Sequence, residues 1–307
     1  MVAGLRYNNV KVIIHSSGLL IHHMKKVTVV VCMFLVCGFA CAQQGPRLIV
    51  RGDDMGYSHA GNEAILKCSR DGIQTSIEVI VPSPWFPEAV KMLEEIPDVD
   101  VGIHLAITSE WDNVKWRPLT ECPSLTDADG YFYPMVNPNK NYPGQAIKDR
   151  PLNVGEIEKE FRAQIELAMK KIPRISHISG HMGCSNLSEE VKAMTKRLAM
   201  EYKIDIDPGE FGVQGVRYEG PSTTGDEKIA GFIKMLGKLE KGKTYLFVDH
   251  PGLDSPELRA IHHIGYEDVA VDRQGVTDTW TSAEVKAAIK KYDVQLISYK
   301  DLKKLKK

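Results

Sequence analysis

The chain reads Arg51-Gly52-Asp53-Asp54-Met55-Gly56-Tyr57-Ser58 directly after the apolar segment Leu48-Ile49-Val50, so two adjacent carboxylates follow a predicted strand. Side chains alternate along a strand, but the backbone turns at its end, where both acids can converge on one site. Neighbouring carboxylates raise one another's pKa unless a cation relieves the repulsion. A divalent metal on one Asp, with the other free as a general base, gives that relief. A simple turn that caps a helix starting near Ser58 or Asn62 is the alternative.

Three histidines favour the metal site because they also stand at the ends of predicted strands. His104 lies in the strand 101–105, His181 follows 177–179, and His250 follows 244–249. The carboxyl ends of parallel strands in a barrel form one rim, which is where such a fold carries its site. One carboxylate and two imidazoles make a three-ligand set that leaves positions open for water and substrate. Any one of these histidines alone would as readily be an ordinary core or loop residue.

Composition describes an ordinary globular protein. The 307 residues are 43% hydrophobic and 26% charged, with a net charge of -1. This is ample material for a core, and no basic excess points to a nucleic-acid partner. A neutral or modestly polar substrate fits this balance best.

Strand-like apolar runs alternate with amphipathic helical stretches, which predicts βα units around a parallel sheet. The predicted strands are 47–50, 75–81, 101–105, 177–179, 204–206, 244–249 and 294–298. The predicted helices are 59–68, 87–95, 154–171, 188–202, 224–239 and 282–291. About seven such units in roughly 265 residues is the size of a single TIM-like (β/α) barrel domain.

The stretch 111–150 is rich in Pro, Asn, Trp and Tyr and is predicted to be a long irregular insertion. Such loops usually form lids or substrate walls, although a plain surface loop is the alternative. Trp111, Trp116 and Arg273 are the candidate substrate contacts. Trp85 and Tyr131 could also stack on a substrate, and ordinary packing is equally open for each aromatic residue.

Residues 1–42 are predicted to lie outside the folded domain, which would then span 43–307. Met24-Lys25-Lys26 is a positive start, 27–40 is apolar, and Ala40-Cys41-Ala42 is typical of a signal-peptidase site. We therefore expect export to the periplasm or the medium, with residues 1–23 as an upstream extension. Lipid attachment at Cys41 is the alternative. The apolar run is short for a transmembrane helix, so no span is expected in the mature chain.

Cysteine usage bears on the metal as well. Cys68, Cys122 and Cys184 remain after the predicted cleavage, and an odd number at wide spacing is no disulfide framework. The chain offers no Cys-x-x-Cys pair for a structural zinc, so histidine and carboxylate must hold any metal.

Four motifs occur in a fixed order along the chain: Asp-Asp-Met-Gly at 53–56, Gly102-Ile103-His104-Leu105, His177-x-x-x-His181, and Asp249-His250-Pro251. In this order they resemble the YdjC-like carbohydrate deacetylases, the family of the chitooligosaccharide deacetylases. The resemblance extends over residues 47–302. It implies an irregular (β/α) barrel related to the polysaccharide deacetylases, and a divalent-metal hydrolase that removes acetyl from an N-acetylated sugar.

By position, the resemblance implies Asp54, His104 and His181 as metal ligands, Asp53 as general base and His250 as general acid. The ion would be zinc or magnesium, with cobalt or nickel as alternatives, and two imidazoles favour the softer ions. The chain departs from the family at two positions, which lie in the segment 177–184. Ser179 replaces an acid and Gly183 replaces a histidine, so the hydrogen bonds or substrate contacts there are in question.

The expected reaction is hydrolysis of an acetamide, in which Asp53 takes a proton from water and His250 gives one to the departing amine. Two alternatives stay open: a metal-dependent hydrolase of another amide or ester, and a catalytically silent carbohydrate-binding barrel. The silent barrel predicts a lost ligand or base, and neither is lost. The sequence leaves open the sugar, the ion and the oligomeric state, for which a homodimer is one possibility.

Overall fold

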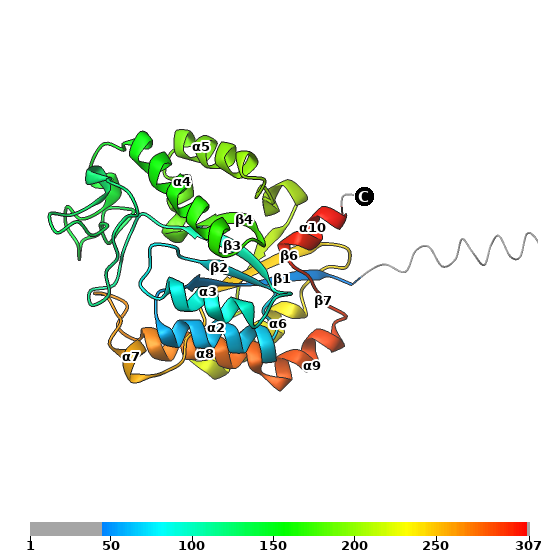
Figure 1. Ribbon diagram of the computed structural model, residues 1–307. Coiled ribbons are helices and arrows are strands. Elements are labelled where there is room, and N and C mark those ends of the chain that lie inside the picture. The colour runs from blue at the N-terminus through cyan, green and yellow to red at the C-terminus, as the bar shows by residue number, and fades with distance from the viewer. Residues whose placement is uncertain (1–44, 306–307) are drawn as a thin grey trace, which may run out of the picture. The chain divides into compact units, whose positions relative to one another are not determined.

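The computed structural model describes residues 45–305, which are built around a parallel β-sheet (Figure 1). Its strands are β1 (Arg47–Met55), β2 (Ser76–Val79), β3 (Asp100–Leu105), β4 (Ile175–Gly180), β5 (Gln214–Val216), β6 (Thr244–Asp249) and β7 (Gln295–Leu296). The order across the sheet is β4-β3-β2-β1-β6-β5, and β7 pairs with the start of β1. Every pairing is parallel, so the carboxyl ends of the strands lie at one edge.

Helices connect the strands and pack against the sheet. They are α2 (His59–Asp71), α3 (Phe86–Glu94), α4 (Val154–Lys171), α5 (Glu189–Glu201), α6 (Gly225–Leu236), α7 (Pro256–Arg259), α8 (Val269–Thr281), α9 (Ala283–Lys291) and α10 (Tyr299–Leu305). In Figure 1, α2, α3, α6, α8 and α9 lie below the sheet, and α4 and α5 lie above it. Among the described helices, none is long and apolar enough to cross a membrane.

The two faces of β1 pack against different parts of the protein. Leu48 and Val50 pack in one apolar cluster with residues of α6 and α8, whereas Ile49 packs with Tyr299 and Leu302 of α10. This alternation is what a strand covered on both faces requires. Further along, the face that carries Ile49 turns polar, beginning with Arg51, and this polar face leads to the site.

The sheet stops short of a closed barrel. Its path ends at β4 and β5, and no pairing joins these two strands in the described residues. A cavity of about 720 Å³ lies beside β4, lined by Ser179, Arg51 and Tyr299 and by residues of α5 and of the turn η4 (Pro208–Phe211). The predicted α/β fold with an irregular, barrel-like parallel sheet is confirmed.

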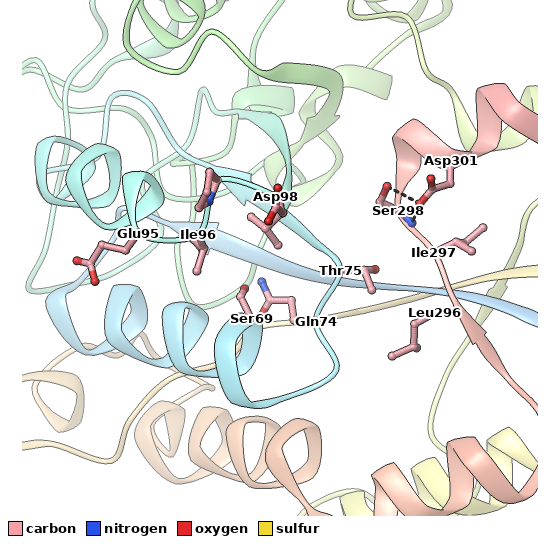
Figure 2. A pocket seen from close by; sticks show the side chains of 12 residues that line it. Ser69, Gln74, Thr75, Glu95, Ile96, Asp98, Leu296, Ile297, Ser298 and Asp301 are labelled. Carbon is pink, nitrogen blue, oxygen red and sulfur yellow. Dashed lines mark hydrogen bonds between the residues drawn. The ribbon is translucent and has the colours of Figure 1, made fainter. Parts of the chain in front are cut away.

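A second cavity, of about 490 Å³, lies where the strands β2 and β3 begin (Figure 2). Thr75 and Val99 line it just before β2 and β3 begin, and Ser298 lines it just after β7. This is the amino-terminal end of β2 and β3, whereas function in such folds resides at the carboxyl ends. The cavity is therefore separate from the site described below.

Several sequence predictions need correction. The strand predicted at 204–206 is wrong: Ile204 and Ile206 are buried, but the segment is irregular, and β5 forms at 214–216 instead. Its apolar-polar alternation imitated a strand. The helices α7, α8 and α10 were not predicted. In α8 eight residues of thirteen are buried, so the helix has no clear polar face to reveal it.

Two further predictions concerned the insertion 111–150 and the leader 1–42. The insertion 111–150 is irregular as predicted, and its regular structure is limited to the short turns η1 (Pro123–Leu125) and η2 (Ile147–Asp149) and isolated bridges. It still buries side chains, including Leu125 and Phe132. The predicted leader, 1–42, lies outside the described residues.

An aromatic cluster between β6 and the helices α6 and α8 gives a test of the fold. Phe247 lies with ring centroids 4.8 Å from Phe232 and 4.9 Å from Tyr218, and it is 1% exposed. Phe247→Ala should lower the free energy of unfolding by about 3–5 kcal/mol, because it leaves a cavity in this cluster. Urea denaturation measures the change. Val271→Ala, at a position that is 59% exposed, should stay within about 0.5 kcal/mol of wild type. Equal effects of the two variants would contradict this packing.

Candidate metal centre

The end of β1 brings its two acids together through an irregularity in the strand. The pairing of β1 with β2 shifts register between Gly52 and Met55, and Asp54 has a φ of 70°. Asp tolerates this left-handed conformation better than most residues. The irregularity interrupts the normal alternation, so that His104 Nε2 lies 3.7 Å from Asp53 Oδ2 and 3.5 Å from Asp54 Oδ1. Both acids therefore face one site, as predicted, but they lie at an irregularity within β1, which continues to Met55, and not at a turn after Val50.

Asp54, His104 and His181 form a buried group that could hold a metal ion. His104 comes from β3, and His181 starts the turn η3 (His181–Asn186) directly after β4. One donor atom from each of the three residues lies within 4.8 Å of the others, and His181 Nδ1 is 3.1 Å from Asp54 Oδ1. Ligands bound at about 2.1 Å around one tetrahedral ion stand roughly 3.4 Å apart, so this donor set fits a single divalent cation.

Neighbouring groups hold the atoms of these residues that face away from the centre. Ser179 Oγ lies 2.6 Å from His104 Nδ1, and Glu110 Oε2 lies 2.9 Å from His181 Nε2. Arg273 donates from Nη2 to Asp54 Oδ2 at 3.0 Å. Such partners orient ligands in metal sites, and here they leave one atom of each ligand free to converge.

Charge compensates charge across the centre. Burial alone would raise the pKa of Asp54, but the facing His250, His181 and Arg273 outweigh it and hold the pKa well below its usual range. Burial would lower the pKa of His181, whereas Glu110 and Asp54 raise it to about 10. Burial prevails at His104, whose pKa is lowered. The Asp54 carboxylate is thus stabilised in its charged form, which is the form that binds a cation.

Asp53 is held by a neighbour on its own strand. Arg51 donates from Nε to Asp53 Oδ1 at 2.7 Å and from Nη2 to Oδ2 at 2.8 Å, a bidentate pair. A third bond, from Arg51 Nη1 to the Tyr299 hydroxyl at 2.9 Å, anchors the guanidinium to α10. The plane of the Asp53 carboxylate is therefore fixed beside the three candidate ligands.

His250 follows β6 on the accessible side of the centre. Its Nε2 lies 3.7 Å from Asp54 Oδ2 and its Nδ1 lies 3.6 Å from Asp249 Oδ1, and its side chain is 39% exposed. Burial acts to lower the pKa of His250, but Asp54 and Asp249 outweigh it and raise the pKa. Asp249 therefore stands beside the imidazole, and its Oδ2 also accepts a hydrogen bond from the Tyr218 hydroxyl at 2.9 Å.

The three predicted substrate contacts all lie near the centre but are covered. Trp111, Trp116 and Arg273 are 1%, 3% and 4% exposed. The Arg273 guanidinium lies 5.2 Å from the Trp111 ring and bonds Asp54, and the Trp116 ring is 6.3 Å from that of His181. Their role toward a substrate stays a prediction.

The other two aromatic candidates have different surroundings. The Trp85 side chain is exposed and its ring lies 5.4 Å from that of His59. Tyr131 lies under the guanidinium of Arg117. Packing accounts for each of these contacts.

Sequence reasoning missed two partners of the centre and left two positions in question. Glu110 belongs to no recognisable motif. Arg51 stands in the opening motif, and its spacing of two residues from Asp53, which places both on one face of the strand, is the signal that could have revealed it. Ser179 faces His104. Gly183 adopts a φ of 74° in η3, a conformation that favours glycine.

Comparison with known proteins identifies the family of this chain. The family model described as YdjC-like protein matches residues 47–291. A carbohydrate deacetylase of Brevibacillus brevis is 28% identical over 266 residues, covering 83% of this chain and 99% of the relative. A carbohydrate deacetylase of Thermus thermophilus is 31% identical over 235 residues, covering 70% and 80%.

A solved structure has the same fold. It is a crystal structure of an Enterococcus faecalis V583 protein provisionally assigned to cellobiose-phosphate cleavage, with a TM-score of 0.67 at 22% identity. The match covers 84% of this chain and 99% of that one. Together with the family model, these relatives establish that the chain belongs to the YdjC-like family, as its four ordered motifs indicated.

Proposed function

We propose that this protein is a divalent-metal hydrolase that removes the acetyl group from an N-acetylated sugar or oligosaccharide. The observation that carries the proposal is the buried convergence of Asp54, His104 and His181, with Asp53 fixed beside them. The relatives named carbohydrate deacetylases support the reaction class and the carbohydrate substrate. The two nitrogen donors favour zinc, cobalt or nickel over magnesium.

The residues around the centre divide the work of amide hydrolysis. A divalent ion held by Asp54, His104 and His181 would supply Lewis acidity to the acetamide carbonyl and to the attacking water. Asp53 accepts the proton of that water, and Arg51 keeps its carboxylate in the orientation needed. His250 lies beside the centre with a partly exposed side chain, from where it can donate the proton that the departing nitrogen requires. Asp249 holds the imidazole from behind.

The proposed activity is tested by acetate release from a panel of N-acetylated mono- and oligosaccharides, with O-acetyl esters and unrelated amides alongside. Wild type should release acetate from at least one N-acetylated sugar, lose this activity in chelator, and regain it with an added divalent metal. Turnover confined to the other amides or esters would replace the substrate class. Sugar binding without any turnover would support a silent barrel.

The ligand assignment predicts the metal content of variants. Asp54→Ala, His104→Ala and His181→Ala should each bind far less metal than wild type, because removing one of three protein ligands strongly lowers the affinity for the ion. Elemental analysis of the purified proteins measures the stoichiometry, and circular dichroism checks the fold. His59→Ala removes a partly exposed imidazole outside the centre and should leave the metal content unchanged. Wild-type stoichiometry in all three ligand variants would refute the site.

The proton-transfer roles predict a loss of turnover without a loss of metal. Asp53→Asn should keep the metal while turnover falls by roughly 10²- to 10⁴-fold, as is typical when a general base is removed. His250→Ala should cost a similar factor for the departing amine. Steady-state kinetics on the best substrate of the panel measures both, with the exposed Asp129→Asn as a matched control. An Asp53→Asn enzyme that works at near wild-type rate would contradict the assignment.

Export is a separate proposal that rests on the leader sequence. Cleavage after Ala42 should give a mature chain that begins at Gln43, because Ala40-Cys41-Ala42 follows an apolar run. Mass spectrometry of the protein from the periplasm or medium identifies the new N-terminus. A lipid on Cys41 would indicate anchoring, and an uncleaved cytoplasmic chain would refute export.

A further inference from the structure

A buried carboxylate, Glu78, lies behind the metal centre on the polar face of the sheet. The strand register places Glu78 of β2, Gly102 of β3 and His177 of β4 side by side. Glu78 and His177 are both 0% exposed. A Cβ on Gly102 would come within 2.5 Å of His177 Nε2 and 2.6 Å of the Glu78 carboxylate, so the glycine leaves the room that the two side chains occupy.

Both oxygens of Glu78 are engaged. Oε1 lies 2.5 Å from His177 Nε2, and Oε2 accepts a short hydrogen bond from the hydroxyl of Ser179. The Tyr299 ring stacks on the His177 ring with centroids 3.6 Å apart, which fixes the imidazole. Burial would raise the pKa of Glu78, but His177 and Arg51 lower it to about 2, so the carboxylate is ionised and can only accept.

Counting protons then fixes the direction of the next bond. The hydroxyl of Ser179 has one proton, which it donates in its hydrogen bond to the charged Glu78 carboxylate. The other contact of Ser179 Oγ, with His104 Nδ1 at 2.6 Å, must therefore be one in which Oγ accepts. The Ile103 carbonyl, 3.4 Å from the same Oγ, is a much weaker competitor for the serine proton. His104 thus carries its proton on Nδ1 and presents a free lone pair on Nε2.

We propose that Glu78 and Ser179 are positioning residues for the metal centre: the carboxylate acts through the serine hydroxyl to set the tautomer of His104 and to aim its Nε2 at the ion. The inference rests on the proposed function, since it takes His104 as a ligand. Partners of this kind typically change metal affinity or activity by about 10- to 100-fold. A carboxylate thereby supports His104 from the neighbouring strand β2, although position 179 itself carries no charge.

The tautomer is measured first, because it requires no metal. Nitrogen-15 NMR of metal-free protein labelled at histidine, with His104 assigned by difference from His104→Gln, reports which ring nitrogen is protonated. Wild type should carry the proton on Nδ1. A proton on Nε2 in neutral His104 would overturn the proposal whether or not the chain binds metal, so this outcome is independent of the proposed deacetylase activity.

Zinc affinity, measured by competition with a chromophoric chelator, is the second readout. Ser179→Ala should weaken zinc binding by about 10- to 100-fold, because His104 Nδ1 loses its acceptor. Glu78→Gln should weaken zinc binding by a similar factor, although it preserves the size and shape of the side chain at position 78. Thr195→Val is the matched control, since it removes a buried hydroxyl that donates to the Val191 carbonyl of its own helix. Affinity within twofold of wild type in folded Ser179→Ala protein would overturn the proposal.

A rescue variant separates positioning from simple loss of packing. The double change Glu78→Ser with Ser179→Asp moves the carboxylate onto β4, where it can accept from His104 directly and faces no second buried acid. It should recover at least part of the zinc affinity lost in Ser179→Ala and restore the Nδ1 proton. If a folded double variant binds zinc no better than Ser179→Ala, the buried charge does not act through His104, and the proposal fails.

Discussion

The architecture of the site depends on placing two adjacent carboxylates, Asp53 and Asp54, in the protein interior. Uncompensated, each buried charge would cost several kcal/mol. The chain meets the constraint with one arginine for each acid: Arg51 holds Asp53, and Arg273 holds Asp54 from 219 residues away along the chain. This compensation ties β1 to α8, and it leaves Asp54 Oδ1 directed at two imidazoles. Electrostatic balance and ligand geometry are therefore achieved by the same contacts.

The polar face of the sheet extends this arrangement into the body of the fold. Arg51, which holds Asp53, also donates a hydrogen bond to the Tyr299 hydroxyl. The Tyr299 ring stacks on the ring of His177, which bonds Glu78. The C-terminal helix α10, which contributes Tyr299, thereby supports residues that lie behind the candidate metal ligands. Removing one member of such a buried network leaves another polar group unpaired, which is why these positions are expected to be sensitive beyond their own contacts.

The sequence predicted what local pattern controls and missed what only register or tertiary packing reveals. Asp53, Asp54, His104, His181 and His250 were found because each stands at or just after the end of a predicted strand, and the family resemblance singled out Asp54, His104 and His181 as ligands. Glu78 and Glu110 carry no such signal, because their importance depends on which strand or loop lies beside them. Arg273 was flagged as a substrate contact without its helix, since α8 is buried on most faces and shows no amphipathic period. The false strand at 204–206 shows the reverse error, in which a buried loop imitates the alternation of a strand.

In the part of the chain that the structure describes, β4 and β5 do not pair with each other, and this affects how the fold can vary. Closing a barrel fixes the strand tilt and stagger for the whole ring, so a change in one strand propagates to all the others. A sheet that ends at two edges has no such closure condition. The segments that cover the opening, α5 and η4, can change length or sequence without altering the register of β1, β2, β3 and β4. Diversity is therefore expected to accumulate along this edge of the sheet, while β1, β2, β3 and β4 keep one geometry.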